Sequence, residues 1–67
     1  MRNFIFDVWV WSKNKHSRLL KQIRIKAQSF PSDLFCLNEA AKDDDISPYI
    51  KSDEFEVTID NLREYQD

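Results

Sequence analysis

The sequence predicts a small α+β domain with the element order β-β-α-β, a three-stranded antiparallel sheet and one helix packed on one face. Three observations predict this fold. Two alternating apolar segments lie near the N-terminus, a helix-start signal follows them, and a third alternating segment comes after an acidic run. The 67 residues form one expected domain, residues 1–67, near the lower size limit for a single hydrophobic core.

The first strand is expected over residues 3–12, where seven of ten residues are aromatic or β-branched. The even-numbered residues from 4 to 10 are all Phe or Val and share one face. Ile5, Trp9 and Trp11 lie on the other face, interrupted by Asp7. A strand that is apolar on both faces is either central in its sheet or carries a binding surface.

The second strand is expected over residues 18–28, after a polar turn at residues 13–16. A hairpin that pairs Phe4 with Ile25 and Val10 with Leu19 places the apolar residues of both strands on the same face of the sheet, so this register is favoured. The opposite face then gathers an apolar patch surrounded by cations, with Arg18 across from Trp11. The expected members of this aromatic and basic surface are Trp9, Trp11, Leu20, Ile5, Arg18, Arg24 and Lys26.

The helix is expected to begin at residues 29–33, with Ser29 as the cap and Pro31 in the first turn, and to run to about Lys42. The acidic run at residues 43–45 opposes the helix dipole and ends the helix. The helical residues expected to face the sheet are Phe30, Leu34, Leu37 and Ala41.

Residues 46–52 are expected to form a loop anchored by Ile46, Tyr49 and Ile50. The third strand is expected over residues 54–60, with an acidic outer face, before a closing turn at residues 61–67 in which Leu62 and Tyr65 pack inward.

The third strand could lie beside the second or beside the first. Placement beside the first is preferred, because the most apolar strand then becomes central and the sheet has the order 2-1-3.

Composition excludes several classes of protein. The chain has no glycine, which removes the Walker-type and dinucleotide-binding loops. A single cysteine, the absence of a signal-peptide pattern and the absence of an apolar run of about 20 residues lead us to expect a soluble, cytoplasmic protein without a membrane partner.

No residues with a catalytic arrangement are apparent. His16 lies in the polar turn and Cys36 on the helix, and neither has a sequence neighbour that could activate it. Residues 43–54 have acids at positions one, three and twelve of a calcium loop, but Pro48 replaces the required glycine and Lys51 occupies position nine. We therefore expect a non-enzymatic protein with no metal and no cofactor.

The charge is strongly segregated. Residues 1–32 hold seven Lys or Arg against one acid, a net charge of +6, whereas residues 33–67 hold three against eleven, a net charge of −8. Either the two halves pair within the fold, or each faces a partner. The acidic residues expected to bind a basic groove of a protein partner, and so to imitate nucleic-acid phosphates, are Asp43, Asp44, Asp45, Asp53, Glu54, Glu56 and Asp60.

The aromatic and basic surface leaves alternatives open. Tryptophan and arginine dominate protein interfaces, so this surface is expected to bind a target or a second copy of the chain, unless a loop or the C-terminal segment covers it. The competing hypothesis is a nucleic-acid-binding module in which Trp9 and Trp11 stack on bases. Its expected phosphate contacts are Lys13, Lys15, Arg18, Arg24 and Lys26.

The chain resembles the small phage-encoded proteins that inhibit host defence, anti-CRISPR proteins among them. The resemblance lies in the single small cytosolic domain, the β-β-α-β order, the absence of a catalytic group and the segregated charge. It implies an inhibitor of a host nucleic-acid-targeting complex of the CRISPR type.

Overall fold

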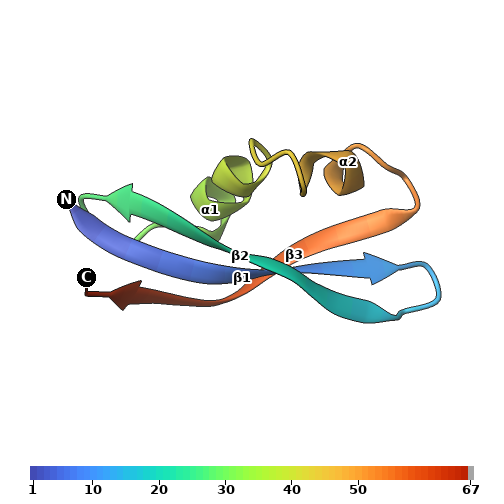
Figure 1. The fold of residues 1–67 in the computed structure, drawn as a ribbon, viewed down its shortest axis with the longest axis horizontal. Helices are drawn as coiled ribbons and strands as arrows, with labels where there is room; N and C mark the ends of the chain where they lie inside the picture. The colour runs from blue at the N-terminus through green and yellow to red at the C-terminus, as the bar shows by residue number, and fades with distance from the viewer. Residues whose placement is uncertain (67) are drawn as a thin grey trace.

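A computed structural model describes residues 1–66 and shows a three-stranded antiparallel sheet with two helices (Figure 1). The order along the chain is β1 (Arg2–Ser12), β2 (Ser17–Ala27), α1 (Asp33–Ala40), α2 (Ser47–Ile50) and β3 (Phe55–Tyr65). The strands lie in the order β2-β1-β3, and β1 is antiparallel to both neighbours. The predicted α+β class and the central position of the most apolar strand are confirmed.

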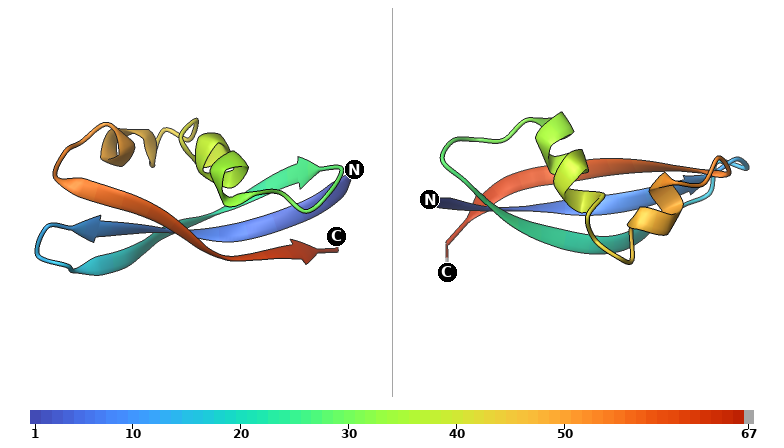
Figure 2. Two further views of the ribbon diagram at one scale, coloured as in Figure 1. Left: turned by 180° about the vertical axis from the view of Figure 1, so that it is seen from behind. Right: turned by 90° about the horizontal axis from the view of Figure 1, so that it is seen from above.

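Both helices lie on the same face of the sheet, and the views in Figure 2 show that the other face carries no helix. The core forms between the sheet and this helical layer. Phe4, Phe6 and Val8 of β1 are fully buried, and they meet Cys36 of α1 and Ile46 from the inter-helix segment. Below, the sheet surface under the helices is called the covered face and the other surface the open face.

The hairpin between β1 and β2 closes without glycine. The Lys15 amide donates to the Ser12 carbonyl and the Ser12 amide donates to the His16 carbonyl, each at 2.9 Å. Lys15 has a φ of 63°, the left-handed conformation that lets a short loop match the twist of the two strands.

The predicted register is confirmed for only part of the hairpin. Phe4 pairs with Ile25, as expected, but β2 contains an extra residue beyond Val8. Lys21 opposes Val8 and Leu19 opposes Trp9, so Leu20 is an unpaired bulge residue. The predicted pairing of Val10 with Leu19 and of Trp11 with Arg18 is therefore wrong.

The helix begins later than predicted and turns a different side to the sheet. Ser32, not Ser29, is the N-cap, because its hydroxyl accepts a hydrogen bond from the Phe35 amide at 3.1 Å. Cys36 and Ala40 are fully buried, whereas Leu34, expected to face the sheet, is 68% exposed. The small side chains of Cys36 and Ala40 let α1 pack closely on the sheet.

The expected loop after the acidic run contains the short helix α2, with Pro48 in its first turn. Ile46 is fully buried, as expected of an anchor, and the Tyr49 ring packs edge-on against Phe55 with centroids 5.1 Å apart. Ile50 remains 39% exposed.

The third strand is longer than predicted and replaces most of the expected closing turn. β3 continues to Tyr65 because a bulge absorbs the break in alternation: Asn61 and Leu62 together oppose the single residue Phe6. Asn61 has a φ of 56°, a conformation that Asn tolerates better than most residues. Leu62 packs against the core.

Candidate partner-binding surface

The open face is built from the odd-numbered residues of β1 and their cross-strand neighbours. Trp9 lies between Leu19 of β2 and Thr58 of β3, and Trp11 lies between Ser17 and Glu56. Trp11 is 40% exposed and Leu19 is 47% exposed. Because no helix in the described part of the chain covers this face, both indoles stand on a bare sheet surface.

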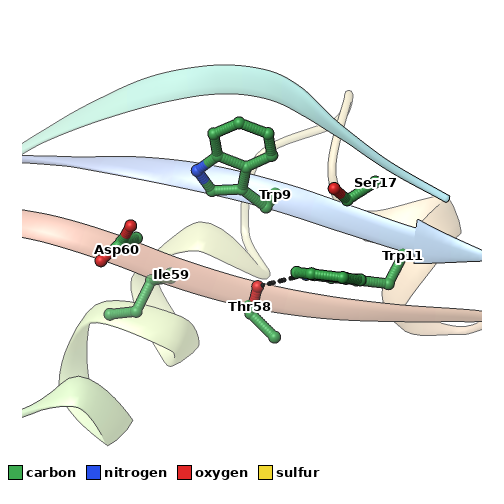
Figure 3. Close-up of a pocket in the computed structure, with 6 residues that line it drawn as sticks. All are labelled: Trp9, Trp11, Ser17, Thr58, Ile59 and Asp60. Carbon is green, nitrogen blue, oxygen red and sulfur yellow. Dashed lines mark hydrogen bonds between the residues drawn. The ribbon is translucent and has the colours of Figure 1, made fainter. Parts of the chain in front are cut away.

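The two tryptophans border a hollow of about 370 Å³ in which Thr58 and Asp60 also take part (Figure 3). The Trp11 indole N–H donates to the Thr58 hydroxyl at 2.9 Å, which holds the ring along β3. Figure 3 shows the Trp9 ring face-on and the Trp11 ring edge-on, so the two indole rings are not stacked in parallel. We call this arrangement the tryptophan corner.

One apolar residue assigned to the aromatic surface lies on the other face of the sheet. Leu20, expected beside the tryptophans, packs against the core on the covered face, and Leu19 takes its place opposite Trp9. The bulge at Leu20 causes this exchange, because one extra residue reverses which side chains of β2 face each surface. Ile5 lies on the open face as expected but is only 8% exposed.

The cations do not surround the tryptophans as predicted. Beyond the bulge, Arg18 faces the helical layer, where its guanidinium lies over the Tyr49 ring, 5.5 Å from the centroid, and donates to the Tyr49 hydroxyl. Arg24 opposes Ile5 and lies over the Tyr65 ring, with 5.7 Å between its guanidinium carbon and the ring centroid.

Lys26 opposes Asn3, close to the far end of β1. The site of Arg24, opposite Ile5, is four residues from Trp9 along β1, or about 13 Å at the rise of an extended strand. Lys13 and Lys15 lie in the hairpin turn. The five cations expected to contact nucleic-acid phosphates are therefore distributed over both faces and both ends of the sheet.

Carboxylates, instead, lie beside the tryptophans. Glu56 opposes Trp11, and Asp60 lines the tryptophan corner. A second hollow of about 150 Å³ adjoins Trp11 and is lined in part by Asp53, Glu54, Glu56 and the single cation Lys13. None of these four acids forms an ion pair within residues 1–66.

Asp7, next to the tryptophan corner on β1, differs from these four acids because its negative charge has hydrogen-bond and ion-pair partners within the fold. Its carboxylate accepts a hydrogen bond from the Gln22 amide at 3.0 Å, and the Arg63 guanidinium lies 3.6 Å away. The Asn61 amide is 3.5 Å from its second oxygen. Arg63 also donates to the Asn61 carbonyl at 2.6 Å, so its guanidinium is held by two acceptors.

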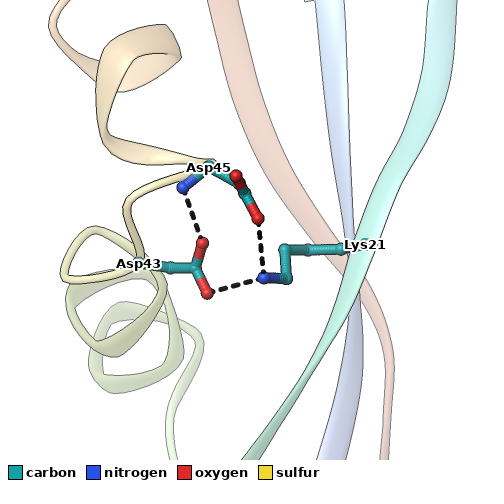
Figure 4. Close-up of polar contacts among 3 residues, drawn as sticks. All are labelled: Lys21, Asp43 and Asp45. Atoms are coloured by element: carbon teal, nitrogen blue, oxygen red, sulfur yellow. Dashed lines mark hydrogen bonds and ion pairs between the residues drawn. The ribbon is translucent and has the colours of Figure 1, made fainter.

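The rest of the predicted acidic surface belongs to the helical layer. Lys21 of β2 binds Asp43 at 2.8 Å and Asp45 at 3.1 Å, and the Asp45 amide donates to Asp43 (Figure 4). Hydrogen bonding to Lys21 lowers the pKa of Asp43, and the two carboxylates raise the pKa of Lys21. Asp44 is exposed.

The seven acids therefore do not form one surface. Glu56 and Asp60 lie on the open face, and Asp53 and Glu54 lie beside them before β3. Lys21, from the basic half of the sequence, partly neutralises the acidic run at residues 43–45. Arg2, from the same half, forms an ion pair with Glu64 at 2.8 Å. Pairing within the fold thus accounts for part of the charge segregation.

The sequence reasoning missed a second exposed apolar group on the outer side of the helical layer. Leu34 and Phe35 of α1 are 68% and 42% exposed, and Phe30 is 56% exposed while its ring packs edge-on against Phe4. The helical pattern assigned Phe30 and Leu34 to the core, so only their actual exposure reveals them.

The two residues considered for catalysis lie apart. His16 is exposed in the hairpin turn, whereas Cys36 is buried in the core, where burial raises the pKa of its thiol. Within residues 1–66, the structure shows no group of three or more histidine, cysteine or acidic side chains placed to hold a metal ion.

Comparisons with protein families, characterised proteins and solved structures found no match to this chain. Neither helix in the described residues has the length and apolar character needed to cross a membrane.

Proposed function

We propose that this protein is a non-enzymatic binding module that attaches to a basic surface of a protein partner through its open face. The observation that carries the proposal is the position of both indoles on the bare side of the sheet, next to carboxylates that no cation of residues 1–66 pairs with. Tryptophan supplies much of the energy of protein interfaces, and unpaired acids favour a cationic partner.

The dimensions of the molecule suit this role. The Cα atoms extend over 38 by 18 by 18 Å, and the three eleven-residue strands run along much of the long axis (Figure 1). The open face is therefore long enough to contact an extended segment of a partner without the helical layer.

The class of partner follows from the charge and from the resemblance to phage-encoded defence inhibitors. Surfaces that hold nucleic-acid phosphates are rich in Lys and Arg, and an acidic protein can occupy them in place of the phosphates. The function proposed here is inhibition of a nucleic-acid-targeting complex of the CRISPR type. Four acids beside the tryptophans, rather than all seven acids, supply the phosphate-like charge.

The experiment is a cleavage assay with a panel of purified RNA-guided nuclease complexes and increasing amounts of the protein. Inhibition of at least one complex is expected, with a potency that falls as salt increases. The variant Glu56→Lys/Asp60→Lys should lose most of the inhibition. The matched control is Asp44→Lys, which reverses one exposed charge on the helical layer.

A second comparison separates the two apolar surfaces. Trp9→Ala/Trp11→Ala should remain folded by circular dichroism and fail to inhibit, because these side chains face away from the core. Leu34→Ala removes an exposed apolar side chain from the other side of the molecule and should inhibit normally. The proposal would be contradicted if Leu34→Ala lost inhibition while Trp9→Ala/Trp11→Ala kept it. It would also be contradicted if Glu56→Lys/Asp60→Lys inhibited as well as the unmodified protein.

A further inference from the structure

We propose that the tryptophan corner receives a single cationic side chain, arginine or lysine, from an extended basic segment of the partner. This inference rests on the proposed function and adds the chemistry of the group that the corner binds. It concerns the hollow of about 370 Å³ between Trp9, Trp11, Thr58 and Asp60.

The aromatic part of the corner suits a cation. Indole has the most favourable ring face for an ammonium or guanidinium group, which binds within about 6 Å of the ring centroid. The Trp11 N–H is already bonded to Thr58 at 2.9 Å, so that donor is not available to an anionic ligand such as a phosphate. What Trp11 offers to a ligand is therefore mainly the surface of its π system, and the face of the Trp9 ring lies beside it.

The charge of the corner supports the same ligand. Asp60 is the single charged residue among those that line it, and its carboxylate is exposed. Arg63, which lies on the same face, is held by Asp7 and by the Asn61 carbonyl. A ligand cation over an indole can therefore meet a carboxylate that has no cation partner within residues 1–66.

An extended segment can deliver that side chain to the site. The second hollow begins on the other side of Trp11 and is lined by Asp53, Glu54 and Glu56. Alternate side chains of an extended chain lie about 7 Å apart, roughly the spacing of Trp9 and Trp11 on β1. A basic segment lying along the face can thus place one cation in the tryptophan corner and another near the acids before β3.

The test uses short peptides and the intrinsic fluorescence of the protein, whose only tryptophans are Trp9 and Trp11. The peptides are acetyl-Gly-X-Gly-amide, with X as arginine, lysine, citrulline or norleucine. Citrulline keeps the planar shape of the arginine side chain, but a carbonyl oxygen replaces one NH2 group, so it lacks the charge and two of the five N–H donors. The arginine peptide should change the fluorescence with a dissociation constant on the order of 1 mM, and citrulline should bind at least about fivefold more weakly.

Two variants locate the cation. Asp60→Asn keeps the shape of the side chain and should weaken the arginine peptide severalfold without changing citrulline binding. Asp44→Asn, which removes an exposed carboxylate from the helical layer, is the matched control and should leave both affinities unchanged. The two indole N–H resonances in a ¹H–¹⁵N spectrum should shift with the arginine or the lysine peptide.

Equal binding of arginine and citrulline peptides, or no binding of either cation, would overturn the inference. So would concentration-dependent dimerisation in sedimentation that Trp9→Ala/Trp11→Ala abolishes, since a second copy of the chain would then occupy the face. These results differ from failure of the proposed function. If the tryptophan variant loses nuclease inhibition while arginine and citrulline bind alike, the face is the interface but the corner does not select a cation.

Discussion

Ile46 provides the sharpest test of the layered arrangement, because the open face stays bare only if the helical layer is held on the other side. Ile46 lies between the helices, is fully buried and belongs to the same core cluster as Phe4 and Phe6. Ile50, four residues later, is 39% exposed and provides a matched control of the same residue type. The perturbation is Ile46→Val, which removes one methyl group.

The magnitude follows from burial. Removing one methyl group from a fully buried isoleucine costs about 1 kcal/mol, and Ile46→Ala costs about 2–5 kcal/mol. A domain of this length has a total stability of roughly 3–10 kcal/mol, at about 0.05–0.15 kcal/mol per residue. Ile46→Ala is therefore expected to remove a large part of the total stability, whereas Ile46→Val should remove much less and lower the Tm by about 4–8 °C.

The assay is urea unfolding followed by circular dichroism for Ile46→Val, Ile50→Val and the unmodified protein. Ile50→Val should cost about 0.5 kcal/mol or less, because its side chain keeps contact with water. Neither substitution should change the affinity of the arginine peptide, which binds on the other side of the sheet. If the two valine variants are equally stable, the inter-helix segment is not docked in the core and the assignment of the open face fails.

Three further outcomes test local features. Lys21 lowers the pKa of Asp43, so their interaction stabilises the fold above about pH 4, the unfolded value, and is lost as the pH falls through the lower folded value. Lys21→Met should therefore reduce stability at pH 7 and flatten its decline in acid, whereas Lys51→Met should not. The Cys36 thiol should resist a disulfide reagent at pH 8 until urea unfolds the chain, because it is buried with a raised pKa. Asn61→Val should cost about 1–2 kcal/mol in urea unfolding and Asn61→Gly about 0.5 kcal/mol or less, because a β-branched residue disfavours a φ of 56°.

The order of the strands was predictable from residue patterns alone. β1 is apolar on both faces, which favours a central position, and the other two strands alternate, so each has one apolar face and suits an edge of the sheet. The pairing of Phe4 with Ile25 followed from the same pattern, because a shift of one residue would have exposed the apolar side of β2.

The faces of β2 beyond the bulge could not be predicted, because the sequence there reads Leu19-Leu20. Because positions 19 and 20 are both leucine, either side chain can face the core. A strand with strict alternation and no bulge places Leu19 on the core side. Packing against the helical layer selected Leu20, and that exchange turned Arg18 away from the tryptophans toward Tyr49. A single bulge thus removed Arg18 from the expected basic rim, whereas Arg24 and Lys26 remain on the open face, toward the other end of β1.

The sequence alone determined the α+β class, the central strand and the presence of two tryptophans outside the core, since these depend on local alternation and on the number of apolar residues. Only the tertiary structure decided what surrounds the tryptophans. Glu56 and Asp60 lie more than 40 residues from Trp11 in the sequence, and the pairing of β3 with β1 brings them to the same face. Alternation says which residues of a strand share a side, but the neighbours across strands depend on bulges and register, which the packing of the whole domain selects.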